Sequence, residues 1–310
     1  MQINIKISDA LKGERFDLVI CKFVPALSRS RAAGFIQTRC LSVNNRYRKP
    51  GYRVKSGDLV TGNIPEEKSC ACVSAQKIDL DIVFEDEYII VINKRAGMVV
   101  HPGPGNTSDT LVNALLSRCP SIAATCNDSF RSGIVHRLDK DTSGLIVAAK
   151  TSQALEFLQR EFKYRRVKKK YLAIVSGRLS SCEGEIEMPI GRHPVKRKIM
   201  AVNHKTGRYA RTLWKVKKYL ENASLVEILL KTGRTHQIRV HFYAIDHPLI
   251  GDSVYQYRKN RRNRSVAPRQ MLHSWQLGFR HPYSGRKMLF KAEPPEDFTQ
   301  VQAKLKLFGS

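Results

Sequence analysis

The spacing of apolar residues predicts a small N-terminal unit that contains both helices and strands. Apolar and polar side chains alternate over residues 1–8, which is typical of a strand. The apolar positions of residues 16–23 predict a helix, and residues 28–38 predict a second helix with Ser28 as its N-cap. Strands at residues 41–43 and 59–60 complete this unit, so we expect a small α/β domain.

The rest of the chain alternates short apolar runs with turns and a few helices. A helix is expected from residue 111, and strands are expected at residues 78–83, 88–93, 145–149, 171–175 and 225–230. Because strands follow strands without regular βαβ alternation, the pattern indicates an α+β domain with a mixed, largely antiparallel sheet. We expect a first domain over residues 1–70, a linker over residues 71–80 and a larger domain over residues 81–310.

The charge balance narrows the choice of partners. The chain has 54 Lys+Arg against 27 Asp+Glu, which gives a formal net charge of +27. Such a surplus causes strong self-repulsion unless the protein binds a polyanion. Nucleic acid is the leading candidate, because cations that bind phosphates release condensed counterions. An anionic membrane surface is the alternative, but the sequence has no basic amphipathic helix with a large apolar face, so no membrane partner is expected.

The lengths of the apolar runs and the placement of the cysteines indicate the cellular compartment of the protein. No apolar run approaches the roughly 20 residues that span a bilayer, and residues 1–8 are unlike a signal peptide. The 7 cysteines are scattered, which favours free thiols in a reducing cytosol and therefore a cytoplasmic protein. Cys70 and Cys72 lie close together, but no second Cys or His pair follows at zinc-finger spacing, so no metal site is expected.

A basic segment marks the N-terminal unit. Eight basic residues and no acidic one lie between Arg29 and Lys55. Arg29 and Arg31 fall in the first turn of the second predicted helix, where cations oppose the helix dipole. A phosphate bound at that helix N-terminus would explain them, and the alternative is a solvated basic face.

The densest cluster of charged side chains lies in residues 133–144. Arg137, Asp139, Lys140 and Asp141 stand between two apolar runs. A loop held by buried strands fixes the positions of its charged groups, and this arrangement suits catalysis. The alternative is a hairpin turn with surface ion pairs.

Residues 231–241 form a second candidate site, in which Thr235 is expected to cap a helix. His236 and Arg239 lie three positions apart and therefore share a face of that helix. Arg234 lies just before the helix N-terminus, whose positive dipole end also favours an ionised carboxylate. The alternative is an ordinary strand-to-helix junction whose arginine binds solvent or phosphate.

A third candidate site is Tyr171, which follows Lys169 and Lys170. A tyrosine after a basic run can stack on a base while the lysines hold the nucleic-acid backbone. The alternative is core packing at the start of a strand.

Together these segments resemble the RluA family of pseudouridine synthases, and in particular its ribosomal large-subunit branch. The resemblance covers nearly the whole chain. It rests above all on His-Arg-Leu-Asp at residues 136–139 with Thr-Ser-Gly at residues 142–144, and on Gly-Arg-Thr-His-Gln-Ile-Arg at residues 233–239. The N-terminal unit resembles a small RNA-binding domain named after a ribosomal small-subunit protein. The resemblance implies that the larger domain is a catalytic domain of the pseudouridine synthase type.

The resemblance also implies roles for individual residues. Asp139 would start cleavage of the uridine glycosidic bond, as nucleophile or as base, and Arg234 would pair with it. Tyr171 would pack on the flipped base, and Arg137 would enter the RNA stack. The remaining candidate RNA-binding residues are Arg29, Arg31, Lys169, Lys170, His236 and Arg239.

The expected partner is therefore large-subunit ribosomal RNA or a pre-ribosomal particle, bound by a monomeric enzyme. The reaction is an isomerisation, so the resemblance implies neither a metal nor a nucleotide nor a redox cofactor. Three alternatives stay open: a pseudouridine synthase that acts on transfer RNA, a non-catalytic RNA-binding assembly factor, and a basic protein that binds DNA or membrane surfaces.

Overall fold

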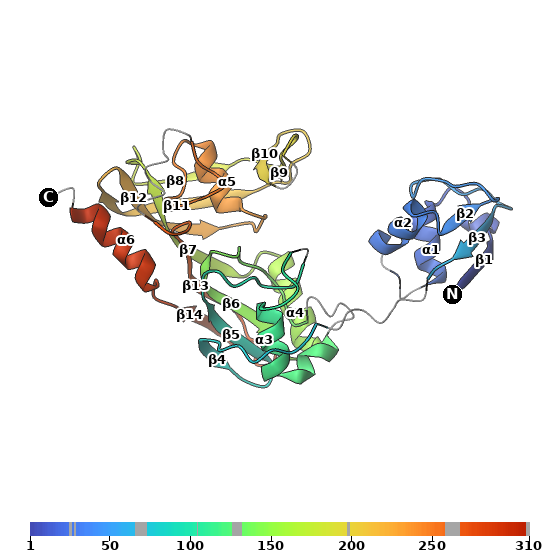
Figure 1. The fold of residues 1–310 in the computed structure, drawn as a ribbon, viewed down its shortest axis with the longest axis horizontal. Helices are drawn as coiled ribbons and strands as arrows, with labels where there is room; N and C mark the ends of the chain where they lie inside the picture. The colour runs from blue at the N-terminus through green and yellow to red at the C-terminus, as the bar shows by residue number, and fades with distance from the viewer. Residues whose placement is uncertain are drawn as a thin grey trace. The chain divides into compact units, whose positions relative to one another are not determined.

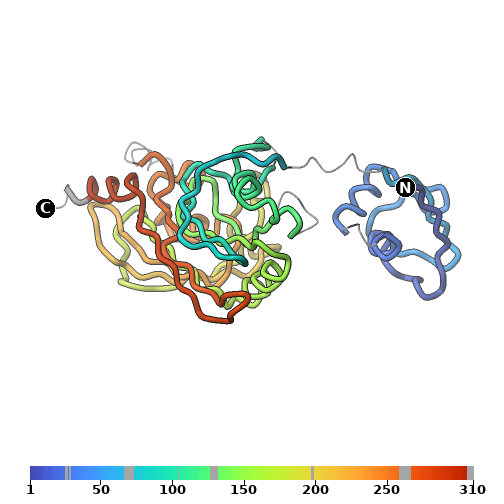
Figure 2. Tube along the Cα trace, turned by 90° about the horizontal axis from the view of Figure 1, so that it is seen from below, coloured from blue at the N-terminus to red at the C-terminus, as the bar shows by residue number. Residues whose placement is uncertain are grey.

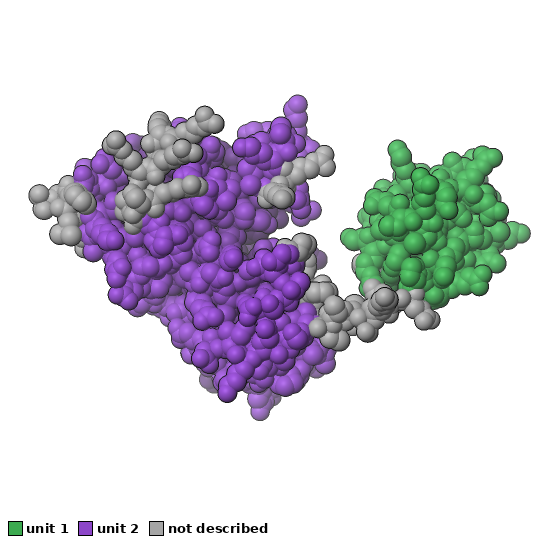
Figure 3. Space-filling view, viewed as in Figure 1, with its two compact units in different colours: residues 1–71 green, residues 72–310 purple. Residues whose placement is uncertain are grey.

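The computed structural model describes residues 1–24, 27, 29–65, 73–103, 105–125, 132–196, 199–257 and 267–307, without the side chains of residues 306 and 307. The chain divides into two compact units, which are residues 1–71 (unit 1) and residues 72–310 (unit 2) (Figure 3). Ser28 lies outside the described residues, so the expected cap of the second helix is left without a structural description.

Unit 1 packs its helices against a three-stranded antiparallel sheet in the order β1-β3-β2. Phe16, Val19 and Ile20 lie on one face of the first helix and are fully buried, which is the spacing that predicted this helix. The predicted helices and strands of the unit are therefore present. Its elements are β1 (Gln2–Lys6), the 3-10 helix η1 (Asp9–Leu11), α1 (Phe16–Phe23), α2 (Arg29–Gln37), β2 (Leu41–Val43) and β3 (Leu59–Asn63).

Unit 2 is built on a mixed sheet of nine strands in the order β4-β5-β6-β13-β7-β12-β11-β8, with β14 paired to β13. All these pairs are antiparallel except β6 with β13. The predicted α+β fold with a mixed, largely antiparallel sheet is thus confirmed. The strands are β4 (Ile82–Glu85), β5 (Ile89–Lys94), β6 (Ser143–Ala149), β7 (Lys168–Ser176), β8 (Glu183–Glu187), β11 (Arg211–Leu220), β12 (Ala223–Leu230), β13 (Leu272–Arg280) and β14 (Lys287–Lys291). A separate pair is formed by β9 (Ile190–Arg192) and β10 (Met200–Val202).

Helices cover both faces of this sheet. Leu111 and Leu115 of α3 pack on one face of β5 and β6, whereas Leu155 and Leu158 of α4 pack on the opposite face. Figure 1 shows α3 and α4 beside β4 to β6, α5 beside β11 and β12, and the strands β7 and β13 between these two parts. The helices are α3 (Leu111–Arg118), η2 (Pro120–Thr125), α4 (Ser152–Lys163), α5 (Gln237–Ala244) and α6 (Glu296–Leu307).

The helix α6 lies at one end of unit 2 (Figure 2). Its Phe298 packs with Ile174 of β7 and Leu220 of β11. Over the described ranges, no helix is both long and apolar enough to cross a membrane.

Two sequence-based assignments near the start of unit 2 need correction. The expected strand over residues 78–83 begins only at Ile82. Residues 73–80, which were expected to lie in a linker, belong to unit 2. The reason is that Ile78 and Leu80 pack against its core, and the Asn113 side chain of α3 donates a hydrogen bond to the carbonyl oxygen of Ser74 at 2.7 Å.

Gly144 allows the parallel strands β6 and β13 to approach each other. Its φ angle is +106°, and a Cβ atom at this position would lie 2.3 Å from the carbonyl oxygen of Ser274. Ser274 is its direct partner in the parallel register. Only glycine adopts this conformation at this separation without a backbone shift. The junction lies directly after the charged segment of residues 136–142, so it also fixes where that segment ends.

We expect Gly144→Ala to lower the free energy of unfolding of unit 2 by about 3–5 kcal/mol, because the positive φ and the backbone clash both oppose it. Urea unfolding followed by tryptophan fluorescence measures this effect, since the two tryptophans, Trp214 and Trp275, both belong to unit 2. Gly97→Ala is the matched control, because Gly97 has a φ of +84° but open space around its Cβ position. It should cost only about 1–2 kcal/mol, and equal losses would contradict the close approach at Gly144.

Candidate active site

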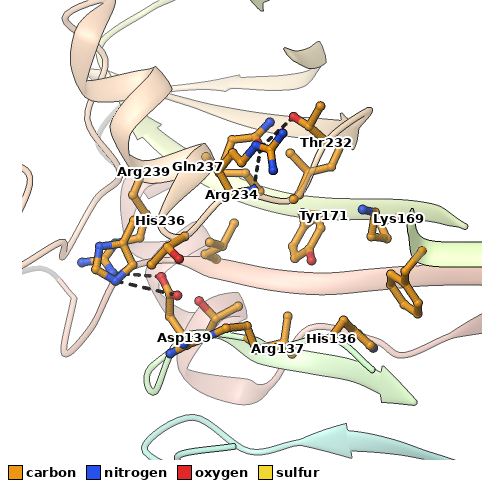
Figure 4. A pocket seen from close by; sticks show the side chains of 18 of the residues that line it. His136, Arg137, Asp139, Lys169, Tyr171, Thr232, Arg234, His236, Gln237 and Arg239 are labelled. Atoms are coloured by element: carbon orange, nitrogen blue, oxygen red, sulfur yellow. Dashed lines mark hydrogen bonds and ion pairs between the residues drawn. The ribbon is translucent and has the colours of Figure 1, made fainter. Parts of the chain in front are cut away.

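A cleft of about 550 Å³ gathers most of the residues that the sequence singled out (Figure 4). Its walls come from the segment before β6, from α4 and the turn after it, from β7, and from the segment between β12 and α5. Of the predicted site residues of unit 2, the cleft brings together Arg137, Asp139, Lys169, Tyr171, Arg234, His236 and Arg239. Residues far apart in the sequence therefore line one cleft.

Asp139 is held by Arg239, which lies in the first turn of α5. Arg239 Nη1 donates a hydrogen bond to Asp139 Oδ2 at 2.9 Å. Its other nitrogens are bound by Asp252, with Nε donating to Oδ2 at 2.6 Å and Nη2 to Oδ1 at 2.9 Å. Asp252 is fully buried and also accepts backbone N–H groups from Val254 and Tyr255. Burial opposes the charge on Arg239, but the hydrogen bonds and charges of the two aspartates outweigh it and raise the pKa of Arg239.

The expected pairing of Arg234 with Asp139 is wrong. Arg234 Nε donates instead to the carbonyl oxygen of Tyr209 at 3.1 Å, and burial with the nearby positive charge of Arg208 lowers the pKa of Arg234. The reason lies in where α5 begins. Its N-cap is His236, in the left-handed conformation with a φ of 55°, and not Thr235.

His236 lies near the other oxygen of the Asp139 carboxylate. Its Nε2 lies 3.9 Å from Asp139 Oδ1, and its Nδ1 lies 2.8 Å from the hydroxyl oxygen of Tyr255. Burial lowers the pKa of His236, and the charge of Asp139 opposes this shift only in part. At neutral pH the imidazole therefore stays uncharged.

Successive side chains of β7 point to opposite faces of the sheet. Lys169 and Tyr171 line the cleft, and burial raises the pKa of Tyr171, which keeps its hydroxyl protonated. Lys170 lies on the opposite face, where it pairs with Glu227 of β12. Its Nζ lies 6.0 Å from the centre of the Trp275 ring. The structure thus separates Lys170 from the cleft to which the sequence assigned it.

Three residues that were not among the predicted site residues hold the segment around Asp139 in place. Lys94 is almost fully buried, and its Nζ donates to the carbonyl oxygen of Lys140 at 3.0 Å. Arg269 Nη1 donates to the carbonyl oxygen of Asp141 at 2.9 Å, and His136 Nε2 accepts the backbone N–H of Val147. Each replaces a strand-like hydrogen bond that an irregular segment lacks. A lysine at the end of the apolar strand β5 was the one signal in the sequence that could have pointed to such a tether.

In unit 1, Arg29 has a structural partner that the sequence analysis also missed. Its Nε donates to Asp17 Oδ2 at 3.1 Å, and Arg15 donates to the same carboxylate at 2.8 and 3.0 Å. Asp17 is buried in α1, so Arg29 ties α2 to α1. A bound phosphate is therefore not needed to explain Arg29. Arg31, in the same turn of α2, is half-buried.

The comparison with known proteins agrees with this architecture. Residues 88–244 match the family described as RNA pseudouridylate synthase, and residues 14–60 match the S4 domain. The chain therefore belongs to the RNA pseudouridylate synthase family, and the resemblance inferred from its sequence is confirmed.

Individual relatives match over nearly the whole chain. Ribosomal large subunit pseudouridine synthase D of Nitrosomonas europaea is 42% identical over 96% of this chain and 86% of its own. The protein of the same name from Zymomonas mobilis is 42% identical over 95% of this chain and 94% of its own. Among solved structures, Human RNA Pseudouridylate Synthase Domain Containing 1 has a TM-score of 0.56 at 30% identity, over 70% of this chain and 84% of that chain.

We expect Arg239→Met to lower the free energy of unfolding of unit 2 by about 3–5 kcal/mol, because Asp252 then becomes a buried charge without its cation. Arg234→Met is the matched control. It removes the same guanidinium from a residue that binds the carbonyl oxygen of Tyr209 and pairs with no aspartate in the described part of the chain, so it should cost less than about 1 kcal/mol. Both values come from urea unfolding followed by tryptophan fluorescence. Equal losses in the two variants would contradict the network drawn around Arg239.

Proposed function

We propose that this protein isomerises specific uridines to pseudouridine in large-subunit ribosomal RNA. The observation that supports this most strongly is the carboxylate of Asp139, placed at the wall of a basic cleft and paired with Arg239. Two relatives that match nearly the whole chain are named ribosomal large subunit pseudouridine synthase D, which supports the same reaction and the same class of RNA. A protein that only binds RNA has no need of a carboxylate among phosphates.

The chemistry of the reaction accounts for the residues of the cleft. Uracil must detach from the ribose, rotate and rejoin through carbon five, so the nucleotide must first leave its helix. Asp139 then acts on the sugar or base as nucleophile or as base. Tyr171 packs on the extruded base, and Arg137 occupies the place that the base leaves in the stack. The walls of the cleft keep water away while the base is detached.

Unit 1 supplies a second surface for RNA in this proposal. Arg46, Arg48 and Lys49 are exposed, and so is Tyr47 beside them. Exposed cations beside an aromatic ring suit a phosphate backbone with unstacked bases. We expect the protein to act as a cytoplasmic monomer on ribosomal RNA or on a pre-ribosomal particle, because RNA itself provides the large partner surface.

We expect Asp139→Asn to abolish pseudouridine formation without weakening RNA binding, since it removes a charge that repels phosphate. The measurement is a map of pseudouridine along an unmodified large-subunit ribosomal RNA transcript incubated with each protein. Asp141→Asn, two residues further along, is the matched control and should keep the wild-type map. Pseudouridine formed by Asp139→Asn would contradict the role of Asp139. Pseudouridine formed by the wild-type protein only in transfer RNA would change the proposed substrate and leave the proposed reaction unchanged.

We expect the combined variant Arg46→Gln, Arg48→Gln and Lys49→Gln to bind RNA with a weaker salt dependence. Each lost phosphate contact lowers the slope of log K against log salt concentration by about 0.7–0.9, so three contacts lower it by about 2–3. Titrations of the same transcript at several salt concentrations give the slope. An unchanged slope would mean that this part of unit 1 does not touch RNA.

A further inference from the structure

A gap separates two hydrogen-bonding atoms at one end of the cleft. His236 Nε2 and Asp139 Oδ1 lie 3.9 Å apart, which is too far for a direct hydrogen bond. Asp139 uses its other oxygen to accept from Arg239. Figure 4 shows the imidazole of His236 and the carboxylate of Asp139 side by side, at the opposite end of the cleft from Lys169. The gap is thus bounded by one ring nitrogen and one carboxylate oxygen.

The hydrogen bonds of the Tyr255 hydroxyl bear on the tautomer of His236, that is, on which ring nitrogen carries the proton. The backbone N–H of Met200 donates to the Tyr255 hydroxyl oxygen at 2.9 Å. The hydroxyl oxygen lies 2.8 Å from His236 Nδ1, so its proton can be donated to this nitrogen. With Nδ1 as the acceptor of that proton, a neutral imidazole carries its own proton on Nε2. The Nε2–H group faces the gap.

The charges around the imidazole keep it in this state. Burial lowers the pKa of His236, the negative charges of Asp139 and Asp252 raise it, and the positive charges of Arg239 and Arg137 lower it. Burial also raises the pKa of Tyr255, so its hydroxyl keeps its proton. The gap is therefore bounded by one donor and one acceptor at neutral pH.

Only a group that both accepts and donates can bridge these two atoms. A hydroxyl does so, whereas a uracil carbonyl oxygen only accepts and a uracil N–H only donates. Two hydrogen bonds of about 2.8 Å that meet near a right angle at one oxygen span a gap of this width. Inside an RNA chain the 3′ and 5′ oxygens are esterified, so the free hydroxyl of a nucleotide is the 2′-hydroxyl.

We propose that His236 and Asp139 form a two-sided binding site for the 2′-hydroxyl of the target ribose, and that this site makes the cleft select RNA over DNA. Tyr255 is a positioning residue that sets the tautomer of His236. The left-handed backbone of His236 at the start of α5 aims its ring across Asp139. This inference rests on the proposed function, because it takes a uridine nucleotide as the ligand of the cleft.

The test compares two versions of one fragment of large-subunit ribosomal RNA, with ribose or with 2′-deoxyribose at every uridine. Dissociation constants and single-turnover rates are measured for both. We expect the deoxyribose version to bind wild-type protein about tenfold more weakly. In His236→Asn this difference should shrink to about threefold or less, because one of the two hydrogen bonds is already absent.

Three further variants separate the hydroxyl site from general damage. Asparagine tolerates the left-handed conformation of residue 236 but does not reach the position of Nε2, whereas His236→Gln reaches it and should restore part of the difference. Tyr255→Phe keeps the ring beside Arg239 and removes the hydroxyl, so it should reduce the difference as well. His204→Asn makes the same replacement at an exposed turn and should keep the full tenfold effect.

Two results would overturn the inference. Equal affinity of wild-type protein for both RNA versions would mean that water alone fills the gap. A deoxyribose effect of the same size in wild type and in His236→Asn would remove His236 from the site. Absence of turnover on the ribose version would count against the proposed function instead, while the binding comparison would still decide whether the hydroxyl is recognised.

Discussion

The site depends on one buried guanidinium between two carboxylates. Taking the charge of Arg239 out of water is costly, and the fully buried Asp252, itself held by two backbone N–H groups, compensates for that cost. The remaining nitrogen of Arg239 is then free to bind Asp139 at the cleft wall. An unpaired carboxylate in a cleft that binds a polyanion would repel the phosphates of that ligand. The pairing with Arg239 offsets this repulsion and so allows an aspartate at the wall of the cleft.

The segment that carries Asp139 is held in place by contacts with two other parts of unit 2. Lys94 at the end of β5 and Arg269 before β13 both bind carbonyl oxygens of the segment that carries Asp139. Gly144 then brings this segment into the parallel pairing of β6 with β13. Asp139 and Arg239 thus come from two parts of unit 2, and the shared sheet sets the distance between them. Such a rigid scaffold suits a reaction in which a base detaches and must rejoin in place.

Apolar spacing predicted the fold class, and the charged segments contain most of the residues that line the cleft, because both are local features. Prediction from the sequence failed where local signals were ambiguous. Arg234 and Arg239 stand in the same short segment, and which one meets Asp139 depends on the left-handed turn at His236, a conformation that histidine adopts only sometimes. Lys170 could have been placed correctly, since strand alternation puts it opposite Tyr171. The tethers of Lys94 and Arg269 depend on contacts between distant segments, which no local pattern encodes.

In the proposed reaction the glycosidic bond of uridine moves from nitrogen one to carbon five, and Asp139 is the group that starts it. Rejoining at carbon five releases the hydrogen that this carbon carried. The most direct measurement therefore uses ribosomal RNA labelled with tritium at carbon five of uridine and follows tritium released to water. We expect release by the wild-type protein and none by Asp139→Asn, and tritium retained by both, or released equally by both, would contradict this proposal.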